Sequence, residues 1–256
     1  NPNERERTEN KVNKETGKLK KFKKKKKKIR AIRPSLDRLK EIQSAIKTNI
    51  LDKAPLPSNI HGGVKKKSNI TNAKQHQGNK FQFTTDLLNF YPGITNDQVY
   101  NTLLSLGFSN HKARWLTKLT TWKFELPQGT STSPHIANLV FLKTDYKLID
   151  LCNELNITYT RYVDDLSFTS QKDFQHDIKE ILSIITTDGF KINYRKTQYK
   201  GSQTITGIKV LNNYIDAPEK IKSKFKKEQA SNTKIKPYSN YLKSIRQTNK
   251  NMILKP

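Results

Sequence analysis

The sequence of 256 residues predicts an α+β protein, with helices and antiparallel strands in separate stretches of the chain. One β-rich run is followed by three helical patterns, then by two β-rich runs joined by a short acidic turn, and then by another helix and further β-rich segments. This order differs from the regular alternation of strand and helix that builds a parallel sheet. The mean hydropathy is -0.82 and no run of about 18 apolar residues occurs, which excludes a membrane-spanning helix.

A large excess of basic residues is the second informative feature. The chain contains 49 Lys and Arg against 22 Asp and Glu, a formal net charge of +27, and residues 1–40 and 218–256 hold most of the surplus. Such a charge requires a polyanionic partner, and nucleic acid is the commonest one. The single cysteine, Cys152, excludes an internal disulfide framework and fits a reducing environment. We therefore expect a cytoplasmic nucleic-acid-binding protein without a membrane partner.

The N-terminal part is predicted to be polar, with one amphipathic helix. Residues 1–20 show no periodicity and are expected to form a flexible basic lead-in. The lysine run 23–28 is typical either of a solvated tail or of a non-specific nucleic-acid arm, and the run alone does not separate the two. A short β-compatible stretch at 29–32 precedes apolar residues that recur at helical spacing from Leu36 to Leu51.

The middle of the chain is predicted to contain one strand and three helices, at 80–85, 97–106, 111–121 and 133–155. Asn96 has the side chain of a helix N-cap, and Gly107 follows the end of the same helix. Ser133 followed by Pro134 predicts an N-cap with proline at the first helical position. Cys152 falls on this last helix, where we expect a buried core thiol.

The C-terminal half is predicted to return to β-structure before a final basic helix. The expected elements are strands at 157–162 and 166–169, a helix at 173–187, strand-like segments at 190–193 and 204–210, and a helix at about 218–230. The two strands that flank Val163, Asp164 and Asp165 read as a hairpin with two adjacent acids at its tip.

These acids need an explanation because acidic residues are scarce in this chain. Asp86 ends a β-rich run, and Asp164 and Asp165 lie between apolar strands, where unpaired carboxylates are costly. Two Mg²⁺ ions about 4 Å apart would resolve the conflict, since Mg²⁺ takes carboxylate and phosphate oxygens and such a pair catalyses phosphoryl transfer. The alternative for Asp164 and Asp165 is an ordinary turn, in which Asp is common.

Several ordered motifs surround the carboxylates, namely TDLLNFYP at 85–92, LPQG at 126–129, TSP at 132–134, RYVDDL at 161–166 and GFKIN at 189–193 with Lys196 and Thr197. In order and separation they resemble the motifs of reverse transcriptases. IRAI at 29–32 with LKEIQ at 39–43 is similar to the fingers segment of that family. NAKQH at 72–76 and ITG at 205–207 resemble elements of the retron type. Taken alone, NAKQH also suits a polar loop with a capping Asn.

The resemblance implies a right-hand polymerase with fingers, a palm whose antiparallel sheet has helices on one face, and a short helical thumb. The implied divisions are a lead-in at 1–20, fingers at 21–80, a palm at 81–205 with fingers elements around 95–125, and the palm end and thumb at 206–256. Asp86, Asp164 and Asp165 would be the catalytic residues, and together with the Leu87 carbonyl they would hold two Mg²⁺ ions.

The resemblance also implies which residues bind the substrates. Arg30, Tyr91, Gln128, Gly129 and Lys196 would contact the nucleotide. Arg30 would hold the triphosphate, Lys196 the departing pyrophosphate, and Tyr91 would exclude a ribose 2′-hydroxyl. Plain phosphate-backbone contact is the alternative for Arg30 and Lys196, and a core aromatic for Tyr91. RNA would be contacted by Lys40, Asn72, His76, Lys220, Lys224 and Lys227.

The implied function is RNA-directed DNA synthesis. The enzyme would copy a cognate structured non-coding RNA into single-stranded DNA linked to RNA, in defence against phage. Its implied partners are that RNA as template and primer, the RNA–DNA hybrid, deoxynucleoside triphosphates and an effector protein. The alternatives are another bacterial defence or group II intron-type reverse transcriptase, and a catalytically silent basic RNA-binding protein.

Overall fold

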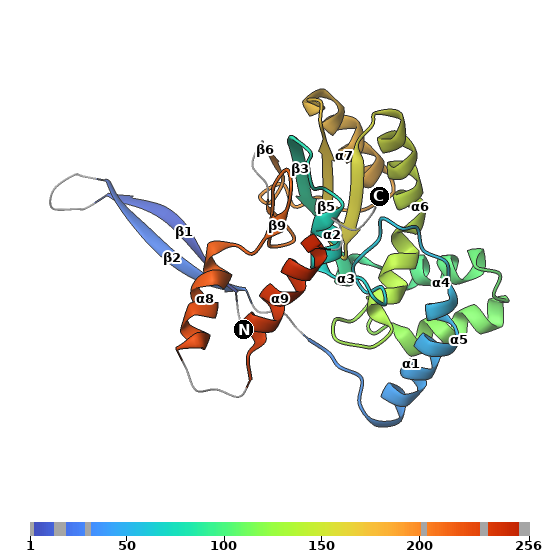
Figure 1. Ribbon diagram of the computed structural model, residues 1–256. Helices are drawn as coiled ribbons and strands as arrows, with labels where there is room; N and C mark the ends of the chain where they lie inside the picture. Colours follow the sequence, from blue (N-terminus) through green and yellow to red (C-terminus); the bar gives the residue numbers. More distant parts are fainter. Residues whose placement is uncertain (1–2, 13–18, 29–31, 201–203, 231–234, 251–256) are drawn as a thin grey trace.

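Four strands form the central antiparallel sheet (Figure 1). The computed structural model describes residues 3–12, 19–28, 32–200, 204–230 and 235–250. In space the strands follow the order β4 (Thr158–Tyr162), β5 (Asp165–Ser170), β3 (Phe81–Asp86) and β6 (Gln198–Lys200). At one end of the β3–β5 ladder, Asp86 lies opposite Asp165. The strands and the helices around them confirm the predicted α+β class.

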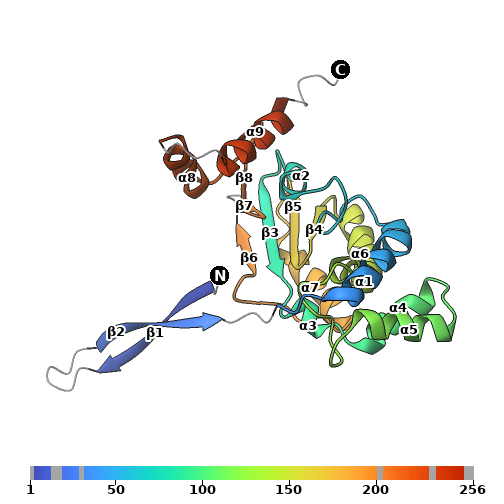
Figure 2. The ribbon, with the colours of Figure 1, turned by 90° about the horizontal axis from the view of Figure 1, so that it is seen from below.

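The two faces of this sheet differ in what covers them. The main core lies on one face, where strand residues such as Phe83 and Phe168 pack with α6 (Ser133–Glu154) and α7 (Ile178–Thr187) (Figure 2). Because side chains alternate along a strand, Asp86 and Asp165 project from the opposite face. The carboxylates therefore lie on the face away from the main helical layer.

Three further helices pack together beside the sheet: α1 (Asp37–Asn49), α4 (Asn96–Ser105) and α5 (Asn110–Thr120). Short helical turns occur at η1 (Leu51–Lys53), α3 (Phe90–Gly93) and η2 (Gln175–Asp177). The predicted N-cap at Asn96 is wrong, because Thr95 Oγ1 accepts from the Gln98 N–H and the Gln98 side chain accepts from the Thr95 N–H. Thr132, not Ser133, precedes α6, and the Ser133 hydroxyl instead donates to the Pro127 carbonyl (2.6 Å).

A second, smaller core joins α2 to the C-terminal part of the described chain. Strands β7 (Thr204–Ile205), β8 (Ile208–Val210) and β9 (Ile215–Asp216) form a sheet that packs with α2 (Asn69–Lys74) and α9 (Pro237–Lys250). The predicted single strand at 204–210 is wrong, because Thr206 and Gly207 both have positive φ and reverse the chain between β7 and β8. Helix α8 (Glu219–Gln229) confirms the prediction at 218–230.

Two other expectations need correction. Instead of a flexible lead-in, Asn3–Val12 (β1) pairs antiparallel with Leu19–Lys28 (β2), which contains the lysine run, and this hairpin extends from the body of the molecule (Figure 1). The segment 190–193 forms no strand, and only one bridge, from Ile192 to Leu87, joins it to the end of β3.

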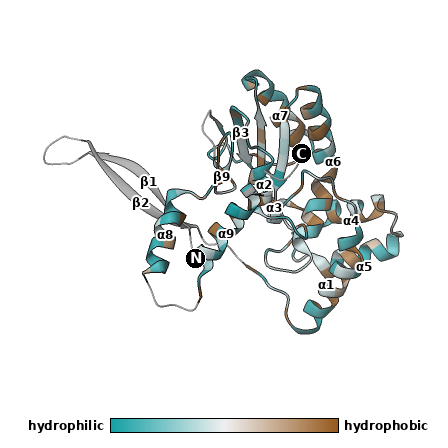
Figure 3. Ribbon diagram, viewed as in Figure 1, coloured by the Kyte–Doolittle hydropathy of each residue, from teal (hydrophilic) through white to brown (hydrophobic). Residues whose placement is uncertain are grey.

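Hydrophilic residues predominate in α8 and α9 (Figure 3). None of the helices in the described part of the chain combines the length and the apolar character that a membrane crossing requires.

Candidate active site

A tight hairpin between β4 and β5 holds the two adjacent acids. Its connection consists of Val163 and Asp164, and Val163 has a φ of 60°, a conformation that a β-branched residue rarely adopts. A Cβ added to Gly62 would lie 2.2 Å from the Val163 backbone nitrogen. Only glycine therefore allows the neighbouring segment to support this strained turn.

The third acid is brought to the hairpin by strand pairing. Asp86 lies opposite Asp165, and the Leu87 N–H donates to the Asp164 carbonyl (2.9 Å). Sequence spacing alone gave no distance between these residues, which are about 80 positions apart. The structure thus brings the three predicted catalytic residues together at one end of the sheet.

Asp86 is held on both sides by donors from the segment after α7. Its side chain is buried, and it accepts a hydrogen bond from Asn193 Nδ2 (2.9 Å) and forms an ion pair with Lys196. The Asn193 N–H also donates to the Asp86 carbonyl (2.8 Å). Sequence analysis gave Asn193 no role, although it lies three residues before Lys196 in the GFKIN motif.

The carboxylates repel one another. Burial, then the charge of Asp164, then the hydrogen bond with Asp86 raise the pKa of the Asp165 carboxyl to about 7. The surroundings of Asp165 therefore disfavour its ionised form. An added positive charge at this position would relieve the repulsion.

The carboxylate oxygens of Asp86, Asp164 and Asp165 are of the type that Mg²⁺ prefers as ligands. Because these carboxylates repel one another, they suit a site that holds a high positive charge. Lys196 now neutralises Asp86. Across the residues that the structure describes, no three His, Cys, Asp or Glu side chains converge closely enough to hold a metal ion in the conformation seen.

A cavity of about 640 Å³ opens on one side of the acids. It is lined by residues from five separate segments, including Ile32, Arg33, Asp86, Tyr91, Gln128, Gly129, Asp164 and Lys196. Burial, followed by the charge of Asp164, raises the pKa of Tyr91 to about 12, so its hydroxyl remains protonated at neutral pH. Four of the five predicted nucleotide-contacting residues thus line one cavity, while Arg30 lies outside the described residues.

Gly129 is required by the shape of this cavity. Its φ is 102°, and an added Cβ would lie 2.7 Å from Ile32 Cγ2. Directly beside it, the Arg33 N–H donates to the Gln128 carbonyl (2.7 Å) and so ties the segment before α1 to the LPQG motif. A larger residue at 129 would strain the backbone at this φ and would have to displace the Ile32 side chain.

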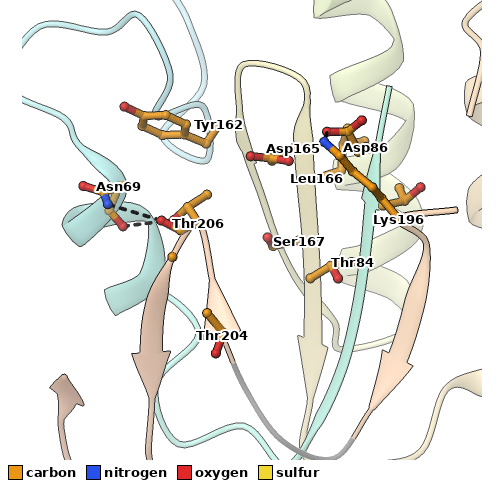
Figure 4. A pocket seen from close by; sticks show the side chains of 12 residues that line it. Asn69, Thr84, Asp86, Tyr162, Asp165, Leu166, Ser167, Lys196, Thr204 and Thr206 are labelled. Carbon is orange, nitrogen blue, oxygen red and sulfur yellow. Dashed lines mark hydrogen bonds and ion pairs between the residues drawn. The ribbon is translucent and has the colours of Figure 1, made fainter. Parts of the chain in front are cut away.

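A second cavity of about 570 Å³ lies on the other side of the acids (Figure 4). Asp86, Asp165 and Lys196 stand on one of its walls, and Asn69, Tyr162 and Thr206 stand on the facing wall. The Asn69 side chain donates to the Thr206 carbonyl (3.2 Å) and to the Tyr241 hydroxyl (2.8 Å). These bonds fix the β7–β8 turn opposite the acids.

A fully buried ion pair supports the acidic hairpin from beneath. Arg161 Nε and Nη2 donate to the two oxygens of Asp145 (2.9 and 2.6 Å), and Arg161 Nη1 donates to Asn138 Oδ1 (2.9 Å) and the Val163 carbonyl (3.1 Å). The Tyr159 hydroxyl donates to Asp145 as well (2.8 Å). This network leaves no signal in the sequence, because the partner Asp145 lies inside a helix 16 positions before Arg161.

The prediction that Asn72 and His76 contact RNA needs correction, because both side chains are fully buried. His76 bonds through Nδ1 to Thr169 Oγ1 (2.8 Å) and through Nε2 to Thr160 Oγ1 (2.6 Å), and Asn72 donates to Thr206 Oγ1 (3.4 Å). Burial, and next the charge of His61, lower the pKa of His76 to about 3. The NAKQH motif lies largely in α2 and joins the two cores.

The lysines predicted to contact RNA are all accessible. Lys40 is exposed on α1, and Lys220, Lys224 and Lys227 are exposed on α8. Lys224 also lies over the ring of Tyr238 (5.3 Å to the centroid). Phosphate contact by these residues stays a prediction.

Comparison with known proteins identifies a family. The profile of the family described as reverse transcriptase (RNA-dependent DNA polymerase) matches residues 22–238. The chain is 35% identical over 176 residues to the retron Ec86 reverse transcriptase of Escherichia coli, which covers 66% of this chain and 55% of that protein. It is 31% identical over 182 residues to the retron Se72 reverse transcriptase of Salmonella heidelberg, which covers 66% of this chain and 48% of that protein. The chain thus spans about half the length of these relatives.

Among solved structures, telomerase from Candida tropicalis with a fragment of telomeric RNA gives a TM-score of 0.49 at 12% identity, covering 84% of this chain and 45% of that one. The foamy viral protease–reverse transcriptase with an RNA/DNA hybrid gives 0.42 at 17% identity, covering 67% and 21%. Neither likeness carries a conclusion at these scores. The family profile, in contrast, spans most of the chain and includes all three carboxylates and the hairpin that holds two of them. This chain therefore belongs to the reverse transcriptase (RNA-dependent DNA polymerase) family, and the curated proteins that it resembles are retron reverse transcriptases.

Proposed function

We propose that this chain is the polymerase part of a retron-type reverse transcriptase, which copies a structured RNA into DNA. One observation carries the proposal. Asp86 and Asp165 face each other at a strand end, with Asp164 in the adjoining turn, and cavities of about 640 and 570 Å³ open on either side of them. Two reactants can therefore approach the same carboxylates from opposite directions.

The reaction is nucleotidyl transfer. The primer hydroxyl oxygen bonds to the α-phosphorus of a deoxynucleoside triphosphate, the bond from that phosphorus to the bridging oxygen breaks, and pyrophosphate leaves. Asp86, Asp164, Asp165 and the Leu87 carbonyl would hold two Mg²⁺ ions, which supply charge neutralisation for the attacking and leaving oxygens. Little covalent chemistry remains for side chains, so the chain acts mainly by positioning.

The larger cavity suits the incoming nucleotide. Tyr91 closes the part next to Asp164 and would exclude a ribose 2′-hydroxyl, and Gly129 leaves room for close approach of the templating pair. Lys196 would leave Asp86 when cations bind and donate to the departing pyrophosphate. The primer end would then occupy the smaller cavity, between the acids and the β7–β8 turn.

The charge distribution supports an RNA partner. Exposed lysines on α8, together with the basic N-terminal region, would hold phosphates of template and duplex, whereas the acids lie between these basic regions in the chain. On the basis of the similarity to retron reverse transcriptases, we further propose an RNA-linked DNA product, an effector partner and a role in phage defence. Asn72 and His76 would serve this function through the fold instead of by touching RNA.

The test is the product made by the purified protein with its co-purifying RNA, Mg²⁺ and labelled deoxynucleotides. We expect DNA joined to a discrete small RNA, which ribonuclease shortens, and synthesis on added RNA templates. The Asp164→Asn/Asp165→Asn variant should make none. Salt-sensitive RNA binding without incorporation by either protein would refute the proposal and favour the catalytically silent RNA-binding alternative.

A further inference from the structure

A two-residue turn at the rim of the nucleotide cavity presents an exposed aromatic ring. Trp122 and Glu125 bridge each other, with the Trp122 N–H donating to the Glu125 carbonyl (2.9 Å) and the Glu125 N–H to the Trp122 carbonyl (3.1 Å). Lys123 and Phe124 form the turn between them, and the Phe124 side chain is 80% exposed. We call residues 122–125 the rim turn.

The backbone of the rim turn is strained in a way that the sequence does not favour. Lys123 and Phe124 both have positive φ, of 47° and 64°. A two-residue turn of this kind normally uses Asn-Gly or Asp-Gly, because other residues pay a steric cost there. Strained backbone tends to persist where function requires it, and here the strain serves to place a large ring in solvent.

Cations accompany the aromatic rings. The Arg33 guanidinium carbon lies 4.4 Å from the centroid of the Trp122 ring, and Lys123 Nζ lies 4.6 Å from it. Arg33 also pairs with Glu125 (2.5 Å), so the negative charge in the rim turn is already neutralised. The surface that results is basic and aromatic, a combination that suits stacked bases with adjoining phosphates.

The rim turn is anchored to the catalytic machinery. Arg33 and Glu125 both line the 640 Å³ cavity that contains Asp86 and Tyr91. The buried residue that follows the turn, Leu126, donates its N–H to the Ile94 carbonyl (3.0 Å). The rim turn therefore lies directly beside the cavity that is proposed to hold the incoming nucleotide and the templating base.

We propose that the rim turn binds the first unpaired template nucleotide ahead of the templating base, with Phe124 stacking on its base and Arg33 and Lys123 contacting its phosphate. This inference rests on the proposed polymerase function and adds a template subsite that the family motifs do not contain. Aromatic stacking of one base strengthens binding on the order of tenfold.

Two primer–templates separate this role from general affinity. Both carry a chain-terminated DNA primer on an RNA template; in one the template ends at the templating base, and in the other it continues for six nucleotides. The measurement is the ratio of the two Kd values, by fluorescence anisotropy. We expect the wild-type protein to prefer the longer template by about tenfold, and Phe124→Gly to lose most of that preference.

Phe124→Gly also guards against a folding artefact. Glycine adopts positive φ without steric cost, so the melting temperature should stay equal to that of the wild type or rise. The matched control is Trp115→Ala on α5, because Trp115 is also exposed (52%) and has Lys118 near its ring (5.7 Å), but lies outside the rim turn and has no cavity-lining residue next to it in the chain. Trp115→Ala should keep the full preference.

A second readout locates the contact. With 5-iodouridine at the first unpaired template position, ultraviolet light should crosslink the RNA to residues 122–124. Equal Kd ratios in wild type and Phe124→Gly, or a crosslink confined to another segment, would overturn the inference. A wild-type protein that extends the same primer with a free 3′-hydroxyl, but does not prefer the longer template, refutes the template subsite alone. Failure to extend that unblocked primer on either template refutes the polymerase function.

Discussion

Replacing Arg161 by Met tests whether the buried ion pair under the acidic hairpin holds the active site together. Arg161 and Asp145 are both 0% exposed, and the guanidinium donates to Asp145, Asn138 and the Val163 carbonyl. Methionine fills similar space but donates nothing, so the Asp145 carboxylate would stay buried without its cation. Removing one partner of such a pair costs about 3–5 kcal/mol of unfolding free energy.

This cost should be visible in denaturation experiments. With about 2–4 °C per kcal/mol for a chain of this size, the melting temperature should fall by roughly 6–20 °C. Urea unfolding should show a lower midpoint with an unchanged slope, because the surface exposed on unfolding is the same. Arg114→Met, which removes an exposed arginine on α5, should change the unfolding free energy by less than about 0.5 kcal/mol.

A double variant supplies a sharper criterion. Arg161→Met/Asp145→Asn should recover part of the loss, because it leaves no buried carboxylate without its cation. A single variant that loses less than about 1 kcal/mol at pH 7, or a double variant that recovers none of the loss, would contradict the proposed role of the ion pair.

Three other substitutions give expected outcomes. Tyr91→Ala should admit ribonucleotides, measured as the ratio of rNTP to dNTP incorporation, and an unchanged ratio would exclude Tyr91 as the sugar discriminator. Gly129→Ala should lose most nucleotide incorporation while the fold is retained by circular dichroism, because the added Cβ meets Ile32 at 2.7 Å; wild-type activity would show that the cavity tolerates the methyl group. His76→Gln should reduce the loss of stability on acidification below about pH 6.5, because the buried ring is protonated only near pH 3 whereas the ring in the unfolded chain is protonated at 6.5. The same variant should bind its cognate RNA and an unrelated duplex with equally reduced affinity. A selective loss of affinity for the cognate RNA would restore direct recognition by His76.

The fold class and the central site could be predicted because local signals and chemistry agreed. Helical patterns located α1, α5 and α6, and β-rich runs located β3, β4 and β5, to within a few residues. Asp86, Asp164 and Asp165 stood out because acids are rare in a basic chain. Sequence spacing could not predict how close these residues lie, whereas the strand register of the structure places Asp86 opposite Asp165.

The errors arose where tertiary contacts override local preference. The lysine run carries no hydrophobic pattern, yet it forms most of β2 and pairs with residues 3–8 of β1. Nothing local distinguishes a buried His76 from an RNA-binding one, since its two partners, Thr160 and Thr169, come from strands more than 80 residues away. Thr95 is the N-cap instead of Asn96, because Thr95 and Gln98 form a reciprocal pair of hydrogen bonds.

The Arg161–Asp145 pair and the rim turn were also invisible in the sequence. Predicting a long-range ion pair requires knowing which helix face packs against which strand. The turn at Lys123 and Phe124 has two positive φ values but contains no Asn, Asp or Gly, the residues from which such a turn is normally predicted. Both features support or border the site instead of forming it.

The central claim is that Asp86, Asp164 and Asp165 act together in metal-dependent nucleotidyl transfer. The most direct measurement is the rate of single-nucleotide addition to a DNA primer on an RNA template, with Mg²⁺ titrated, for Asp86→Asn, Asp164→Asn and Asp165→Asn beside the exposed control Asp173→Asn. We predict that addition by wild type stops on chelation, that each of the first three variants loses about a hundredfold or more, and that Asp173→Asn retains the wild-type rate. Addition at the wild-type rate by Asp86→Asn or Asp165→Asn, or addition that persists without divalent cations, would contradict the claim.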